Sequence, residues 1–270
     1  MQASLSEDKT LPWCAQGLHA TDLVNSMTGR TPSGNVKLPI MLAVATGHEA
    51  GIVQRSVSSA ASAASGQHNF AVIRVGVGCS TLDTNRLGDT CSAIVSVGFA
   101  GALKPGIKSG TLLVPGLIRK SDNTAIDVDA SLQKMITQPM PEQVVDDSLL
   151  HTDRMLVTTA EKHSAFEHSG CAGCDMESGT LALAGEKANR PFACLRVVLD
   201  PASMTIPAPI VSLANAPASA SNDPSGTEFL KAILRQPGQL PATATFLWHT
   251  FVASRALSQS VTRFIKGCCE

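Results

Sequence analysis

The run CDMESGTLALAGEKANRPFACLRVVLDPA, residues 174–202, constrains the fold of this chain more than any other stretch. Residues 191–199 are apolar and rich in β-branched side chains, which is typical of a buried strand. Residues 178–188 are good helix formers, and the helix is expected to end before Pro191. A weaker strand precedes Asp175. The run therefore reads strand, helix, strand, which predicts a right-handed parallel crossover.

Two carboxylates flank this predicted helix. Glu177 lies just before it, and Asp200 ends the strand that follows it. In a parallel crossover both positions lie at the carboxyl edge of the sheet, where open α/β sheets place their ligand sites. A purely structural interpretation is equally open. In that interpretation Glu177 caps the helix and Asp200 starts a turn before Pro201.

A strand followed by a short loop also begins the folded part of the chain. Residues 38–46 are predicted to form the first strand, and Gly47-His48-Glu49 leads into a helix that extends toward Ala64. Glu49 is either a site carboxylate or a first-turn residue that complements the helix dipole. Residues 70–78 form the next predicted strand. Its end lacks the third glycine of a dinucleotide fingerprint, and no Walker-type phosphate loop occurs, so neither a nicotinamide cofactor nor triphosphate hydrolysis is favoured.

A third predicted strand, residues 93–97, continues into the small residues Gly98-Phe99-Ala100-Gly101. Small residues after a strand allow a ligand to approach the backbone N–H groups. A short strand is expected at 110–115. Residues 119–154 are polar and are predicted to be an irregular surface excursion, followed by a short strand at 155–159 and a helix from residue 160.

Composition restricts the classes of partner. The 270 residues carry a formal net charge of −1 and no Tyr, which gives no case for a nucleic-acid partner. With 44% hydrophobic residues the chain can bury a large core, but no apolar run is long enough to span a bilayer. The cysteines at 79, 91 and 194 lie in apolar segments, as in a reducing compartment. Cys171 and Cys174 form a CxxC without a second ligand pair, so no metal site is expected.

The two ends of the chain have a different character. Residues 1–37 are polar and are predicted to be a flexible N-terminal extension, without the apolar segment of a secretory signal. After Asp200 a proline-rich loop leads to predicted helices at 227–235 and 241–265. These helices would cover the sheet, cover the active site, or meet a partner or a membrane surface.

With these motifs in view, the chain resembles the nucleoside phosphorylase and nucleosidase superfamily. The resemblance rests on VSVGFAGALKPGIKSGTLLVP at 95–115 and on the motif at 174–202. Within the superfamily the chain is most similar to the hopanoid-associated phosphorylases, through LDPASMTIP at 199–207 and ILRQPGQLPA at 233–242. The resemblance implies a three-layer α/β/α sandwich around a mixed sheet, formed by residues 38–207, with residues 208–270 packed on the same domain.

The resemblance also implies roles for individual residues. Asp200 matches the acid that protonates the leaving base, and Glu177 matches the carboxylate that holds the ribose hydroxyls while Met176 packs on the sugar. Glu49 is the nearest match to the base that activates water. The turn of residues 98–101, Gly98, Phe99, Ala100 and Gly101, would line the substrate site.

Three positions depart from the pattern of related enzymes. Ser96 stands where related phosphorylases often have a phosphate-holding Arg, and Phe99 stands where many members have Ser or Thr. Both departures favour water over phosphate as the nucleophile, although Arg55, Arg74 or Arg86 would be able to supply the missing charge. Leu199 replaces a Ser that many nucleosidases carry beside the acid, a position that supports the hydrogen bonding of that acid.

These observations lead to an expected function with two alternatives. The chain is expected to be a cytoplasmic enzyme, with membrane association kept open, that releases adenine from an adenosyl-lipid such as adenosylhopane. It would need no cofactor, with inorganic phosphate as an alternative co-substrate, and the superfamily commonly forms homo-oligomers. The alternatives are an enzyme for small soluble purine nucleosides and a nucleoside-binding protein without catalysis.

Overall fold

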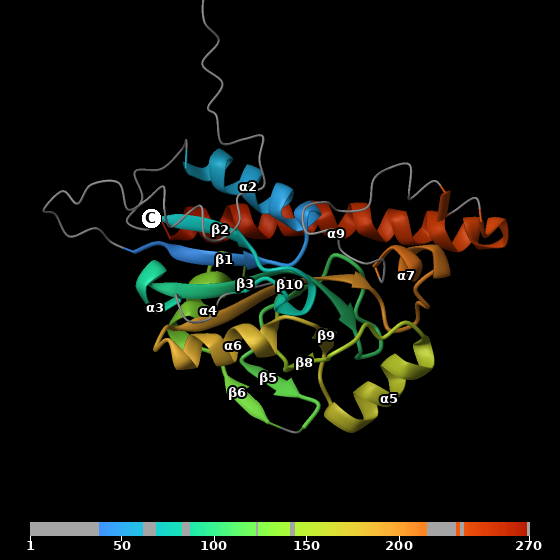
Figure 1. Cartoon of the computed structure of the whole chain (residues 1–270), viewed down its shortest axis with the longest axis horizontal. Coiled ribbons are helices and arrows are strands. Elements are labelled where there is room, and N and C mark those ends of the chain that lie inside the picture. The colour runs from blue at the N-terminus through green and yellow to red at the C-terminus, as the bar shows by residue number, and fades with distance from the viewer. Residues whose placement is uncertain are drawn as a thin grey trace, which may run out of the picture. The chain divides into compact units, whose positions relative to one another are not determined.

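The fold is organised around one long buried strand, β3 (Ala93–Ala102), in a computed structural model of the chain. The structure describes residues 38–61, 69–82, 87–122, 124–140, 144–214, 231–232 and 235–268. The predicted extension over residues 1–37 lies outside them. Figure 1 shows β3 in the middle of the described sheet, between helices above and below it.

Three strands pair directly with β3. Along one edge it pairs in parallel with β10 (Phe192–Asp200). Its other edge is shared, because residues 93–96 pair in parallel with β1 (Ile40–Val44), whereas residues 101–102 pair antiparallel with β9 (Gly173–Asp175). The carboxyl ends of β1 and β9 therefore point toward each other along the same edge of β3, with residues 97–100 between them.

Shorter strands extend this mixed sheet on both sides. Beyond β1 lies β2 (Phe70–Arg74), and beyond β10 lie β4 (Leu112–Leu113) and β7 (Val144–Val145). Beyond β9 lie β8 (Leu149–His151), β5 (Leu117–Lys120) and β6 (Ala125–Asp127). Within the described residues the sheet contains ten strands.

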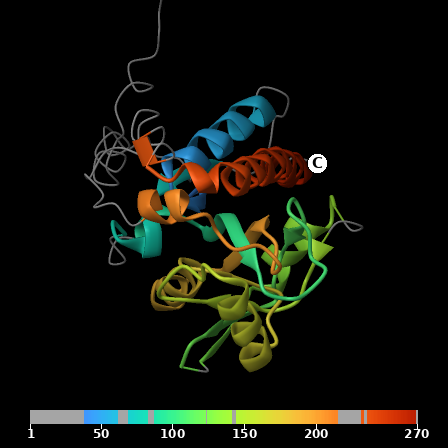
Figure 2. The ribbon, with the colours of Figure 1, turned by 90° about the vertical axis from the view of Figure 1, so that its right-hand side faces the viewer.

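Helices cover both faces of the sheet. Figures 1 and 2 show α2 (Gly47–Ala61) and α9 (Leu240–Gly267) side by side on one face, and α9 also contacts β10 and α4 (Ala130–Thr137). Figure 1 shows α6 (Ser178–Lys187) on the other face, with α5 (Thr159–Ser169) beside β9. The shorter helical elements are α3 (Leu87–Thr90), α7 (Ala208–Ala214), η1 (Val77–Cys79) and η3 (Pro237–Gln239). The expected three-layer α/β/α class with a mixed sheet is confirmed.

Local sequence explains where α5 begins and ends. The hydroxyl of Thr158 accepts the N–H of Glu161, whose carboxylate accepts the N–H of Thr158 in return, which is a complete capping box. Gly170 ends the helix with φ 68°, a left-handed conformation that glycine adopts without strain. These two signals define the ends of α5, the helix on which Lys162 lies.

The predicted parallel crossover from β9 to β10 is wrong. Strand β9 is antiparallel to β3, whereas β10 is parallel to it, so the two strands run in opposite directions. The parallel crossover lies one element earlier, where α5 joins the parallel neighbours β8 and β9. Strand direction depends on which neighbour a strand pairs with, and a strand of three residues carries no local signal of that choice.

The prediction for residues 119–159 is also partly wrong. The supposed irregular excursion contains β6, α4, β7 and β8, and residues 155–157 are not a strand. Strands of two or three residues are too short to show an alternating pattern. Helix α7 was likewise not predicted, and most of the helix expected at 227–235 lies outside the described residues. The cysteines at 79, 91 and 194 are buried, as predicted.

Candidate active site

The candidate site lies in the gap between the ends of β1 and β9, over residues 97–100 of β3. Each of the two strands delivers a carboxylate into the gap within a few residues of its end. Glu49 comes from the first turn of α2, and Glu177 lies at the start of α6. Where neighbouring strands lead into opposite connections, the crevice between them is a common place for a ligand.

Glu49 is almost fully buried and is held by hydrogen bonds from two elements. Its Oε2 accepts the N–H of Thr46 at 2.9 Å and the Thr46 hydroxyl at 3.0 Å. Its Oε1 accepts the N–H of Phe99 on β3 at 2.8 Å. Glu49 is therefore more than a residue that complements the helix dipole, because its carboxylate joins α2 to the centre of the sheet.

Arg196 of β10 is the cation of this site and is 1% exposed. Its Nη2 lies 2.7 Å from Asp175 Oδ2 and 3.4 Å from Glu177 Oε2. The same nitrogen donates to Ser96 Oγ at 2.7 Å and to Ser178 Oγ at 3.4 Å. We call Glu49, Asp175, Glu177 and Arg196 the Arg196 cluster. It contains three carboxylates and one guanidinium, so its formal charge is negative.

The pKa values of Asp175 and Glu177 diverge because the two carboxylates meet Arg196 at different distances. Burial raises the pKa of Glu177 to about 7, helped by the charges of Asp175 and Glu49 and opposed by Arg196. For Asp175 burial also acts upward, but Arg196 outweighs it and lowers the pKa of that carboxyl. Burial would lower the pKa of Arg196, but Asp175 and Glu177 outweigh it, so Arg196 stays charged. Of Asp175 and Glu177, Glu177 is therefore the carboxyl that can take up a proton near neutral pH.

Asp175, rather than Glu177, makes the side-chain hydrogen bonds at the start of α6. It accepts the N–H of Ser178 at 3.2 Å and also the Ser178 hydroxyl. Glu177 makes no such bond and instead accepts the N–H of Gly78 at 3.0 Å. Glu177 is thus the N-cap residue of α6 by position, but its side chain does not cap the helix and instead joins Gly78 and Arg196.

A glycine at position 98 is required by the cluster. A Cβ atom there would lie 2.5 Å from Nη1 of Arg196 and would also overlap the carboxylate of Glu49. Neither side chain can move away easily, because both are buried and hydrogen-bonded. Gly98 therefore lets the two charged groups approach the strand, which is a more specific reason than a permissive turn.

Asp200 belongs to a second cluster, which we call the Lys162 pair. Lys162 of α5 is fully buried, and its Nζ lies 2.5 Å from Asp200 Oδ2. The same Nζ donates to the carbonyls of Pro201 at 3.2 Å and Met204 at 2.6 Å. Burial raises the pKa of Asp200 to about 6, although Lys162 opposes part of this rise. Lys162 thus fixes both the carboxylate and the loop after β10.

The two clusters lie on opposite faces of β3. A Cβ on Gly98 would meet the Arg196 cluster, whereas a Cβ on Gly101 would lie 3.2 Å from Asp200 Oδ2. Residues three apart on a strand face opposite sides. A bulge between Val198 and Asp200 moves Asp200 to this second face. The structure therefore brings Glu49 and Glu177 together and places Asp200 across the strand from them.

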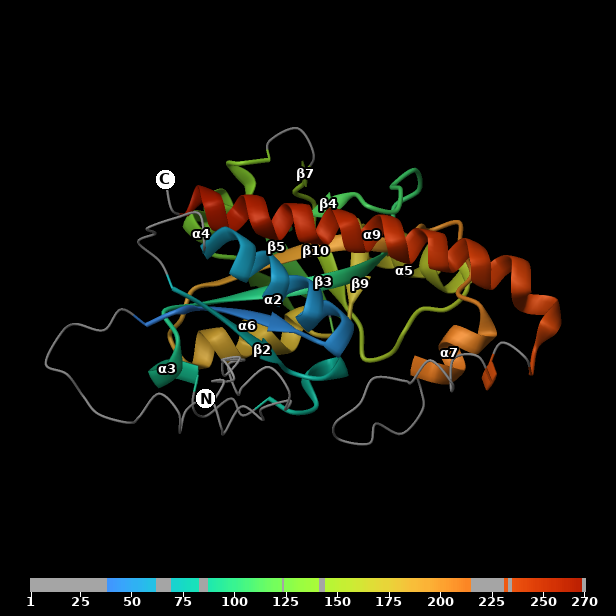
Figure 3. The ribbon, with the colours of Figure 1, turned by 90° about the horizontal axis from the view of Figure 1, so that it is seen from above.

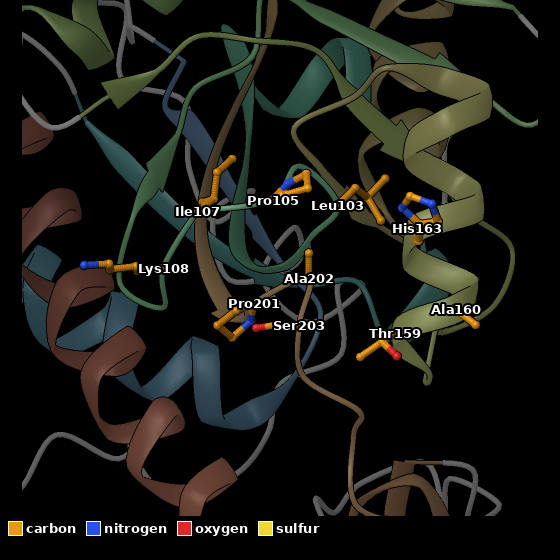
Figure 4. A pocket seen from close by; sticks show the side chains of 11 residues that line it. Leu103, Pro105, Ile107, Lys108, Thr159, Ala160, His163, Pro201, Ala202 and Ser203 are labelled. Carbon is orange, nitrogen blue, oxygen red and sulfur yellow. The ribbon is translucent and has the colours of Figure 1, made fainter.

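A cavity of about 610 Å³ borders the Lys162 pair. It is lined by the loop after β3, by the first turns of α5 and by the loop after β10, as Figure 4 shows. Pro201, which accepts a hydrogen bond from Lys162, is part of its wall, and Thr159 and His163 face it from α5. Its volume lies within the usual range of small-molecule sites.

The remaining predicted residues lie around β3. Met176 is half-buried between Asp175 and Glu177. The ring of Phe99 stacks on His48, with ring centres 6.2 Å apart. Phe99 therefore packs against the first turn of α2. Ala100 is buried and Gly101 adjoins Asp200.

Sequence reasoning missed Arg196 and Lys162. Of the three arginines proposed instead, Arg55 and Arg74 are exposed and Arg86 lies outside the described residues. A lone Arg in the apolar run FACLRVVLD was the available signal, since a charge inside a buried strand needs a partner. Ser96, which stands where related phosphorylases often have an Arg, accepts a hydrogen bond from Arg196 of the neighbouring strand. No such signal marked Lys162, whose helix has a mixed polar sequence.

Comparison with known proteins decides the family. A family model described as the phosphorylase superfamily matches residues 47–233, which is more than half of the chain. The chain belongs to the phosphorylase superfamily. At this level the prediction of a nucleosidase or nucleoside phosphorylase is confirmed. The comparison with curated proteins finds no match.

Solved structures agree with this superfamily fold. The Campylobacter jejuni 5′-methylthioadenosine/S-adenosylhomocysteine nucleosidase has a TM-score of 0.58 at 16% identity, covering 86% of this chain and 99% of its own. The Colwellia psychrerythraea nucleosidase in complex with adenine gives 0.58 at 15%, covering 86% and 96%. Helicobacter pylori futalosine hydrolase gives 0.54 at 17%, covering 74% and 98%. At these identities the likeness establishes the fold of this superfamily member, not its substrate.

Proposed function

We propose that this superfamily member cleaves the N-glycosidic bond of an adenine nucleoside with water as the nucleophile. The observation that carries the proposal is the Arg196 cluster, in which Glu177 pairs with a buried guanidinium and Glu49 approaches the same glycine of β3. Glu49, which is held by Thr46 and Phe99, would accept the proton of the attacking water. Glu177 would bind the ribose hydroxyls as the sugar gains positive charge.

The charge of the cluster supports water over phosphate. Arg196 already meets Asp175, Glu177 and two serine hydroxyls, so a phosphate dianion would enter a site with an excess of carboxylates. Repulsion between like charges in a buried site is costly. Inorganic phosphate as the nucleophile remains the alternative to water, and the experiment below compares the two.

Asp200 is proposed as the acid that protonates the departing base. Because Asp200 and the Arg196 cluster lie on opposite faces of β3, the nucleoside would have to extend past the edge of β3 at residues 97–100, with its ribose at Glu177 and its base toward Asp200. Its pKa, raised by burial to about 6, lets the carboxyl hold a proton near neutral pH. Lys162 contacts Oδ2, so Oδ1 would carry that proton. After transfer to the ring nitrogen of the base, Lys162 would stabilise the carboxylate that forms. Lys162 is a positioning residue in this scheme, because it acts through Asp200.

The finer proposal is an adenosyl-lipid substrate, with adenosylhopane as the specific candidate. Its support is the likeness of residues 199–207 and of the tail at 233–242 to the hopanoid-associated phosphorylases. Such a substrate would bring the enzyme to a membrane surface, and cleavage would release adenine and a ribosyl lipid. A homo-oligomer, expected from the resemblance, is part of this proposal.

A small soluble purine nucleoside is the second candidate. The observation that favours it is the fold shared with a nucleosidase solved in complex with adenine. The non-catalytic alternative would bind adenosine analogues without releasing base.

The deciding experiment measures adenine release by chromatography, with and without phosphate. The substrates are an adenosyl-lipid, adenosine and 5′-methylthioadenosine. Release without phosphate from any of them supports hydrolysis, and Glu49→Gln should then reduce the rate by about 10²–10⁴-fold. If adenine release depends strictly on phosphate, phosphate rather than water is the nucleophile. Binding of an adenosine analogue by a folded protein, with no release from any substrate, would overturn the enzymatic proposal.

A further inference from the structure

Within the described residues, the large exposed apolar side chains are concentrated at one end of α9. The described residues include six large hydrophobic side chains that are exposed, and four of them lie within residues 240–251. They are Leu240, Leu247, Trp248 and Phe251, and the last two are 64% and 58% exposed. Their rings lie 5.8 Å apart. Figure 3 shows that this half of α9 extends past α2. Scattered exposed hydrophobics are ordinary, but a gathered group of this kind marks an interaction surface.

The same face of α9 becomes cationic toward its C-terminus. Trp248, Arg255 and Lys266 are separated by 7 and 11 residues, spacings that return to the same side of an α-helix. Both basic residues are exposed, whereas the opposite side, with Phe246, Leu257 and similar residues, is buried against the protein. One face of the helix thus carries aromatic rings at one end and positive charge at the other.

The helices around α9 add to this charge. Helices α2 and α4 both pack against α9, and they carry the exposed basic residues Arg55 and Lys134. Across these three helices, all within the described part of the chain, the one acidic residue is Glu49, which is buried in the Arg196 cluster. A chain with a formal net charge of −1 therefore carries a layer of helices with exposed charges of one sign, all positive.

We infer that the outer face of α9 docks on an anionic lipid bilayer. An amphipathic helix with Trp, Phe and Leu at one place and Lys and Arg beside them is suited to lie in the interface, with the rings in the headgroup region and the cations on lipid phosphates. None of the described helices is long and apolar enough to cross a bilayer, so the contact is peripheral. The choice of an anionic bilayer rests on the charge of the helical layer.

This inference deepens the proposed function, since a lipid substrate would be met at such a surface. Its test, however, needs no turnover. The chain has two Trp residues, so in a Trp13→Phe variant the fluorescence reports on Trp248 alone. Vesicles of phosphatidylglycerol and phosphatidylcholine should shift this emission to the blue and sediment with the protein, whereas vesicles of phosphatidylcholine alone should do so at least about tenfold less.

Two sets of variants locate the contact. Trp248→Ala/Phe251→Ala and Arg255→Glu/Lys266→Glu should each reduce sedimentation with anionic vesicles by at least about tenfold. Lys187→Glu, at an exposed lysine on α6 across the sheet, is the control for one charge reversal away from α9, to be compared with Lys266→Glu alone, and should bind as the unmodified chain does. Circular dichroism checks that each variant is folded, which is expected because the altered side chains are exposed.

Several outcomes would overturn the inference. One is a folded protein that does not bind anionic vesicles, and another is binding that the α9 variants leave unchanged. A third is a concentration-dependent dimer that Trp248→Ala/Phe251→Ala dissociates while vesicles are ignored, which would make the face a protein interface. Release of adenine from a soluble nucleoside by the same variants is scored separately. Failure of docking and failure of the proposed reaction are thereby distinguished.

Discussion

The Arg196 cluster and the Lys162 pair are two solutions to the same problem, a carboxylate buried beside β3. In the cluster, one guanidinium is shared by two carboxylates and two serines, with a third carboxylate, Glu49, close by. In the pair, one ammonium serves one carboxylate and two backbone carbonyls. The shared arrangement holds Asp175, whose pKa is lowered, beside Glu177, whose pKa is raised. The Lys162 pair instead holds a single carboxylate, Asp200, together with the loop that follows β10.

The largest expected effects are those of changing Asp200 in the Lys162 pair, and they concern both the reaction rate and the free energy of unfolding. Asp200→Asn should reduce adenine release by about 10²–10⁴-fold, because the proton for the leaving base is lost. It should also destabilise the fold by about 3–5 kcal/mol, since Lys162 is left buried without its counter-charge. Steady-state kinetics and urea unfolding measure the two effects.

The double variant Lys162→Met/Asp200→Asn sharpens this test. Removing both charges should recover most of the lost unfolding free energy without restoring the rate. If the double variant regains activity as well, Asp200 is not the acid and the pair is purely structural.

Arg196→Met should destabilise the protein by about 3–5 kcal/mol, because Asp175 and Glu177 would be buried together without a cation. Arg74→Met is the matched control, since Arg74 is exposed and its loss should change the unfolding free energy by less than about 0.5 kcal/mol. Chemical denaturation of both variants makes the comparison. Equal free energies of unfolding for the two variants would mean that Arg196 does not stabilise the buried carboxylates of the cluster.

Gly98→Ala should cost about 1–3 kcal/mol of stability and disturb Glu49, because the added methyl group overlaps both Glu49 and Arg196. Gly238→Ala serves as the control, since a Cβ at that position meets no atom within 4 Å. Thermal unfolding and the rate of adenine release should both fall for the first variant alone. A neutral Gly98→Ala would contradict the close approach of the two charged side chains.

The smallest effect is a pH dependence of stability. The folded pKa of Glu177, about 7, lies above its ordinary value of 4.5. The protonated form is thus favoured in the folded state, and its contribution to stability is lost as pH rises from about 4.5 through about 7. The unfolding free energy should fall by about 1–3 kcal/mol between pH 5 and pH 8 because of this group. Glu177→Gln should reduce that slope, and an unchanged slope would assign the titration elsewhere.

The sequence alone predicted the superfamily and the fold class, which are confirmed, and most of the main strands and helices. It also singled out Glu49, Glu177 and Asp200, whose roles stay predictions. These features were predictable because long apolar strands, glycine turns and helix-ending residues are local signals. The same local signals could not give the direction of β9 or the short strands between residues 117 and 151, because pairing over long distances decides those.

The tertiary structure alone decided how the charges are distributed. It brought Arg196 within hydrogen-bonding distance of Ser96 on the neighbouring strand, and a bulge before Asp200 turned that carboxylate to the other face of β3. It also paired Asp200, at the end of β10, with Lys162 of α5, which no sequence motif had marked. A buried charge takes its partner from whichever element packs beside it, so the partners of these carboxylates become visible only when the layers are assembled.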